Sequence, residues 1–124
     1  MVSKNRAERI SKRIQEVLSE LLLFEVTDPR LKGVYVTDVE VDQDLSYARV
    51  FVSALEGEER SDEILQGFSH ATGYLRALLA KQLDLRVFPR LNFHWDSTPE
   101  KAEQIEKLIA GLHAEDNQKR AKNG

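Results

Sequence analysis

Residues 34–53 read VYVTDVEVDQDLSYARVFVS, and this stretch decides the fold. Both of its ends are rich in β-branched side chains, which favour extended backbone. Between them, Asp42 to Ser46 supply Asp and Ser side chains that hydrogen-bond nearby backbone groups and favour a turn. The pattern therefore predicts strands over residues 34–41 and 47–53, joined as an antiparallel hairpin.

A helix is predicted on the N-terminal side of this hairpin, over residues 3–24. Apolar residues recur there at helical spacing, and Ser3 is placed to cap the first turn. The helix ends before Asp28-Pro29, because the residue that precedes a proline is pushed out of the helical region. Its apolar stripe consists of Ile10, Ile14, Val17, Leu18, Leu21 and Leu22.

A second helical stretch is predicted after the hairpin, over residues 61–83. Ser61 is its expected cap, and acidic residues in the first turn favour the helix dipole. Gly73 interrupts the apolar pattern at a position where glycine costs about 1 kcal/mol relative to alanine. We therefore expect a bend between two helical halves.

A third strand and a last helix complete the chain. Residues 87–95 alternate apolar side chains, and Pro89 indicates an edge strand or an irregular start. The helix begins either at Ser97, in a capping box with Glu100, or at Thr98. The apolar stripe of this helix, against which Trp95 is expected to pack, consists of Ala102, Ile105, Leu108, Ile109 and Leu112.

These elements predict a single α+β domain over residues 1–114, in the order α-β-β-α-(bend)-α-β-α. A three-stranded sheet with helices packed on one side is the simplest layered arrangement. Residues 115–124 are polar and are predicted to form a disordered tail. The length of 124 residues fits one domain.

Composition limits the cellular setting. No run approaches the roughly 20 apolar residues of a membrane span, and the charged N-terminus does not resemble a secretory signal. The chain has no cysteine, which excludes disulfides and thiolate metal sites and suits a reducing cytosol. We expect a monomeric, cytoplasmic protein that makes no membrane contact.

Charge is distributed unevenly along the chain. The net charge is −3, yet residues 1–24 hold five Lys or Arg against three acidic residues, and residues 64–94 hold four against one. Residues 38–63 hold two against nine. Such a chain can present a cationic face to an anionic polymer because local potential governs phosphate contact. The alternative is that these blocks are ordinary solvated surface.

Residues suited to catalysis or metal binding do not form a convincing set. His70, His94 and His113 are too far apart in the sequence for a helical ligand pair. Asp42 and Asp44 could act as acid and base in a small hydrolase, but their place in a turn already explains them. The sequence lacks a nucleophile elbow and a phosphate-binding loop. We therefore expect no enzyme activity, cofactor, metal or small-molecule substrate.

The predicted bend carries the segment Ala71-Thr72-Gly73, followed by Arg76. Small residues allow another backbone to approach, as in the loop by which KH domains clamp a nucleic-acid backbone. The alternative is that Ala71 and Gly73 are small to allow helix packing. At this level the residues indicate a possible RNA-binding α+β domain.

Several segments together resemble the ribosome-binding factor A family. The resemblance covers roughly residues 4 to 112, and its motifs are Asp28-Pro29-Arg30-Leu31, residues 36–41, 44–52 and 71–76, and Pro89-Arg90-Leu91-Asn92-Phe93. It implies a KH-like fold of type II in which Ala-x-Gly at a helix kink, here Ala71-Thr72-Gly73, replaces the usual loop. It also implies a non-catalytic factor that associates with the free small (30S) ribosomal subunit. Such a factor supports processing and late folding of 16S ribosomal RNA, above all in the cold.

The main mechanistic hypothesis is that basic residues hold ribosomal RNA through its phosphates. Arg30 is either part of this surface or a structural element of its turn. The exposed members of the aromatic set Tyr35, Tyr47, Phe51, Phe88 and Phe93 could stack on bases, although core positions are the simpler interpretation. A different hypothesis is a protein-interaction module that docks through its first helix without touching RNA. The proposed RNA-binding residues are Lys4, Arg6, Arg9, Lys12, Arg13, Arg30, Arg76, Lys81, Arg86 and Arg90.

Overall fold

The computed structural model describes the backbone of residues 1–123 and the side chains of residues 1–112. The predicted order of elements is confirmed, and two short 3-10 turns, Pro29–Leu31 and Glu58–Arg60, are added to it. The predicted tail boundary at residue 114 lies outside the residues whose side chains are described, and it stays a prediction. The helices and strands are α1 (Lys4–Phe24), β1 (Val34–Val41), β2 (Tyr47–Ala54), α2 (Ser61–Leu83), β3 (Arg90–Trp95) and α3 (Thr98–Asn123).

The sheet has the order β1-β2-β3, antiparallel between β1 and β2 and parallel between β2 and β3. The hairpin turn forms as predicted, because Asp42 Oδ1 accepts hydrogen bonds from the backbone N–H groups of Ser46 (2.8 Å) and Tyr47 (3.2 Å). The register shifts between Val36 and Asp38, so Thr37 is the extra residue of a bulge. The parallel pairing of β3 requires the crossover that α2 supplies.

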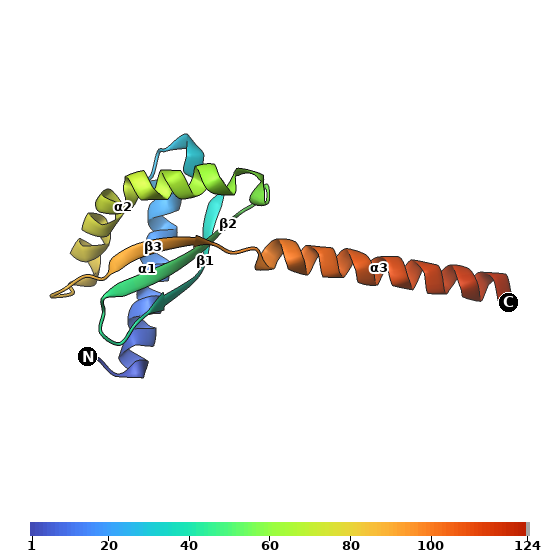
Figure 1. The fold of residues 1–124 in the computed structure, drawn as a ribbon, viewed down its shortest axis with the longest axis horizontal. Helices are drawn as coiled ribbons and strands as arrows, with labels where there is room; N and C mark the ends of the chain where they lie inside the picture. The colour runs from blue at the N-terminus through green and yellow to red at the C-terminus, as the bar shows by residue number, and fades with distance from the viewer. Residues whose placement is uncertain (124) are drawn as a thin grey trace.

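Helices α1 and α2 pack on one face of the sheet and build the core (Figure 1). Ile14, Leu18 and Phe68 are among its fully buried side chains. The rings of Phe68 in α2 and Phe93 in β3 stack with centroids 4.3 Å apart, which joins the helix to the edge strand. This arrangement confirms the α+β, KH-like architecture.

Helix α2 is continuous over 23 residues, and its axis bends partway along its length (Figure 1). Thr72 Oγ1 donates to the carbonyl of Phe68 at 2.7 Å, a contact with the preceding turn that commonly bends helices. Gly73 is exposed, and a Cβ at this position would meet no atom within 4 Å. Helix packing therefore does not require Gly73. Gly67 is the more closely packed glycine, since a Cβ there would lie 3.0 Å from the end of the Leu31 side chain.

Two predicted boundaries are wrong. Strand β3 begins at Arg90 rather than residue 87, because Phe88 and Pro89 are buried in the irregular segment before it. Ser61 is the first residue of α2 rather than its cap. The 3-10 turn runs directly into the helix, and the N–H of Ser61 already bonds to Glu58.

Helix α3 extends away from the sheet (Figure 1). Ile105, Leu108, Ile109 and Leu112 are about half to two-thirds exposed, so the predicted apolar stripe does not enter the core. Trp95 packs against the main core cluster. An amphipathic pattern specifies that a face is apolar, but it does not specify what covers that face. Within residues 1–123, no helix is long and apolar enough to cross a membrane.

Candidate nucleic-acid interface

The basic residues of α1 fall on two different flanks of the helix. The stripe formed by Ala7, Ile10 and Ile14 faces the core and separates these flanks. Each residue advances about 100° around a helix, so Arg6 and Arg13 project in nearly the same direction, while Lys4 projects far from both. The five cations therefore spread over a wide arc of the exposed side of the helix, with Arg9 and Lys12 between Arg6 and Lys4.

The first flank faces α2 and carries arginines. Arg6, Arg9 and Arg13 line a groove of about 300 Å³ with Ile10 from α1. Arg13 pairs with Glu16 at 3.3 Å, but both side chains are more than half exposed, so this pair adds little stability. The groove, called here the arginine groove, is completed by Gln82, Leu83 and Leu85 from the end of α2 and the segment after it.

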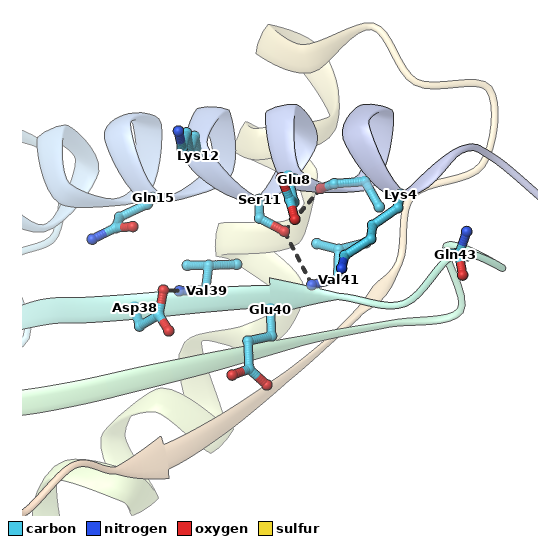
Figure 2. A pocket seen from close by; sticks show the side chains of 11 residues that line it. Lys4, Glu8, Ser11, Lys12, Gln15, Asp38, Val39, Glu40, Val41 and Gln43 are labelled. Carbon is cyan, nitrogen blue, oxygen red and sulfur yellow. Dashed lines mark hydrogen bonds between the residues drawn. The ribbon is translucent and has the colours of Figure 1, made fainter.

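The second flank faces β1 and carries lysines together with Glu8, whereas the Glu40 side chain projects from the far side of β1 (Figure 2). Lys4 reaches toward the end of β1, and Lys12 lines the same cavity of about 370 Å³. Ser11 joins helix and strand, because its hydroxyl donates to Ala7 at 2.9 Å and accepts from the N–H of Val41 at 3.1 Å. Glu8 lies on the same lysine flank of the helix, while Glu40 forms an ion pair with Arg49 of β2 at 2.9 Å.

Arg76 and Arg90 lie together at a different place, on the rim where α2 meets the start of β3. They line a cavity of about 400 Å³. Arg76 Nη2 donates to the carbonyl of Phe88 at 2.8 Å, which fixes its guanidinium. Tyr47 and Arg90 are paired across β2 and β3. The structure thus brings these two predicted residues together, apart from the arginine groove.

Arg30 has a structural role. Its Nη2 lies 2.8 Å from Asp28 Oδ2, and its Nε lies 3.1 Å from Asp28 Oδ1. Hydrogen bonds from the Arg30 side chain hold the pKa of Asp28 below its ordinary value. The third nitrogen of the guanidinium, Nη1, lies 3.3 Å from His70 Nδ1. These contacts hold Arg30 against its own turn, and they leave one N–H on each of Nη1 and Nη2 for a further acceptor such as a phosphate.

Lys81 and Arg86 are exposed, and neither lines one of the three cavities described above.

The N-terminal end of α2, opposite the end that carries Lys81, is acidic. The helix spans about 34 Å at 1.5 Å per residue. This length separates the acidic residues at its start from the basic residues near its end. The acidic end consists of Glu56, Glu58, Glu59, Asp62 and Glu63, with Arg60 bound to Glu56 and Glu63.

Comparison with known proteins agrees with this fold and charge pattern. The family model described as ribosome-binding factor A matches residues 6–109. The chain belongs to the ribosome-binding factor A family. A ribosome-binding factor A from Alcanivorax borkumensis is 44% identical over 117 residues, which cover 94% of this chain and 85% of that protein.

Solved structures of family members share the fold. The crystal structure of ribosome-binding factor A from Thermus thermophilus has a TM-score of 0.64 and 30% identity, and the match covers 72% of this chain and 93% of that one. A homology model of the Thermus thermophilus protein, fitted into a cryo-EM map of a 30S–RbfA complex, has a TM-score of 0.62 and 32% identity. That match covers 75% of this chain and 98% of the other.

Membership of the ribosome-binding factor A family indicates a ribosome-binding factor rather than an enzyme. The turn residues fit this assignment, since Asp42 is occupied by backbone hydrogen bonds. Among residues with described side chains, no group of three or more His, Asp or Glu is arranged to hold a metal ion.

The sequence did not indicate which cations have acidic neighbours. Asp28 next to Arg30 was visible, but the contact of Arg30 with His70 and the pairing of Glu40 with Arg49 depend on the fold. Helical periodicity alone would have separated Arg6 and Arg13 from Lys4. The groove residues Gln82, Leu83 and Leu85 carried no signal of their own.

Proposed function

We propose that this member of the ribosome-binding factor A family binds the free 30S subunit and assists late maturation and processing of its 16S ribosomal RNA without catalysing a reaction. The Thermus thermophilus relative fitted into a 30S complex supports the choice of partner. In this proposal the arginine groove holds the RNA phosphates. The protein acts in the cytoplasm, and its contribution is greatest during growth in the cold.

The observation that carries this proposal is the convergence of Arg6, Arg9 and Arg13 beside the end of α2. A guanidinium presents a planar set of N–H donors that matches phosphate oxygens, and it keeps its charge at any physiological pH. The acidic end of α2 repels the RNA backbone and so orients the molecule with the arginine groove toward the subunit. Phosphate contacts fix position but read no sequence, so selectivity comes from the shape of the RNA.

A factor of this kind needs no catalytic group to change the fate of an RNA. A protein that binds one RNA conformation more tightly than its alternatives shifts the population toward that conformation. The shift can be no larger than the difference in affinity between the two states. Binding the late-folded arrangement would therefore make it available to the nucleases that complete processing.

The direct test is sedimentation of the protein with free 30S subunits at about 50 mM and about 200 mM salt. Three phosphate contacts predict a log–log slope of about −2 to −3. A slope near zero contradicts the proposal. So does binding that survives digestion of the ribosomal RNA, which is the result expected of a protein-docking module.

A further inference from the structure

The cavity that contains Arg76 and Arg90 has a composition unlike that of the arginine groove. Its walls come from the hairpin turn, the start of β2, the middle of α2 and the segment that leads into β3. Its volume of about 400 Å³ lies in the range of small-ligand sites. The lining residues are Asp44, Leu45, Ser46, Tyr47, Arg76, Val87, Phe88 and Arg90.

Three kinds of chemistry meet in this cavity. Arg76 and Arg90 supply two guanidinium groups, and the bond from Arg76 to the carbonyl of Phe88 holds one of them in place. Tyr47 supplies an aromatic ring that is 46% exposed, with the apolar side chain of Val87 on the same lining. Asp44 supplies a carboxylate, a pure hydrogen-bond acceptor when ionised.

We propose that this cavity receives a single unpaired nucleotide of RNA, an inference that rests on the function proposed above. The base stacks on Tyr47, its exocyclic amino group donates to Asp44, and the adjoining phosphate lies between Arg76 and Arg90. Aromatic stacking together with cationic contacts to the backbone is the usual way in which proteins hold single-stranded nucleic acid.

The carboxylate distinguishes a nucleotide from other anions. A peptide carboxylate or free phosphate has no N–H donor to offer Asp44 and would be repelled by it. Adenine and cytosine each carry an exocyclic amino group, whereas uracil offers only its ring N3–H, and acidic side chains accept hydrogen bonds from such amino groups. The cavity should therefore prefer adenine and cytosine to uracil.

The test measures binding of the full chain to fluorescent RNA hexamers of adenine, cytosine or uracil by anisotropy. The adenine and cytosine hexamers should bind about 5-fold to 10-fold more tightly than the uracil hexamer. Tyr47→Leu should weaken binding of all three about 10-fold, because the stacking surface is lost. Asp44→Asn should remove the preference between bases, and Arg90→Gln should reduce the salt slope by about 0.7.

Tyr35→Leu is the matched control, because Tyr35 is 37% exposed but lies on β1, outside the cavity. Equal weakening by Tyr35→Leu and Tyr47→Leu would overturn the inference. So would equal binding of the three hexamers, or tighter binding of a phosphoserine peptide. If the unchanged protein does not bind the hexamers but still sediments with 30S subunits in a salt-dependent way, this cavity alone is rejected as a nucleotide site. If the unchanged protein binds neither the hexamers nor the 30S subunits, the proposed function is rejected as well.

Discussion

The two flanks of α1 carry the same kind of charge in different surroundings. Arg6, Arg9 and Arg13 lie beside the end of α2, where the helix dipole favours cations and the only carboxylate paired with them among the described side chains is the exposed Glu16. Lys4 and Lys12 lie beside β1, on a flank of the helix that also carries Glu8. A cation with a carboxylate on its own flank contributes less net potential to an incoming phosphate. The comparison shows that the neighbours of a charge, as well as its sign, decide what it can bind.

Reversing charge in the arginine groove is the strongest test of the difference between the two flanks. Arg9→Glu with Arg13→Glu should weaken 30S binding by about 100-fold, because two charge-assisted contacts become repulsive. Sedimentation with free subunits measures the loss. Both side chains are exposed, so the urea midpoint should remain close to that of the unchanged protein. Unaltered subunit binding would show that the arginine groove does not touch RNA.

A second change tests the link that places the lysine flank against β1. Ser11→Ala leaves the N–H of Val41 without its partner and should cost about 1.5 kcal/mol in the free energy of unfolding. Urea denaturation measures this cost. Ser19→Ala, at a half-buried position of the same helix, is the control and should change stability by less than about 0.5 kcal/mol. Equal effects would mean that the helix–strand bond adds no stability.

Charge reversal on the lysine flank tests whether this flank contributes less to RNA binding than the arginine groove. Lys4→Glu with Lys12→Glu should weaken 30S binding by about 3-fold, since these cations lie outside the arginine groove and act on RNA mainly at long range. The same sedimentation assay applies, at about 50 mM salt. A loss as large as that of the arginine variant would place both flanks in the interface.

The smallest effect concerns Arg30, a cation that is paired with a carboxylate of its own turn. The pKa of Asp28 is lower in the folded protein than its ordinary value of 3.8, so this group favours folding above pH 3.8. The contribution disappears as the pH falls through the lowered folded value. Asp28→Asn should therefore flatten the dependence of the urea midpoint on pH below about 4. An identical pH profile in both proteins would show that the pair does not contribute.

Much of the fold could be predicted because it depends on local patterns. The hairpin followed from β-branched runs around Asp42, and the Ser3 cap is confirmed by its bond to the N–H of Arg6. The boundaries failed where local patterns compete with tertiary contacts. Phe88 alternates like a strand residue but is buried before β3 begins, and Ser61 looks like a cap but lies inside a continuous turn and helix.

The candidate site was less accessible to sequence reasoning. Ten basic residues were expected to form one surface, and the structure distributes them over the arginine groove, the lysine flank, the nucleotide cavity, the Asp28 pair and two separate exposed positions. The charge of a side chain can be predicted from the residue type alone. The neighbours of that charge, such as His70 beside Arg30, can come from elements far away along the chain.

The sequence by itself determined the α+β order of elements, the family and the identity of every charged residue. These depend on periodicity, turn chemistry and composition, which act over a few residues. Only the tertiary structure decided that α3 leaves the sheet, that Gly73 is free of packing contacts, and that Arg76 and Arg90 share a cavity with Tyr47. Such relations depend on how α1 and α2 lie across the sheet. Packing of the whole core sets that arrangement, and no single segment encodes it.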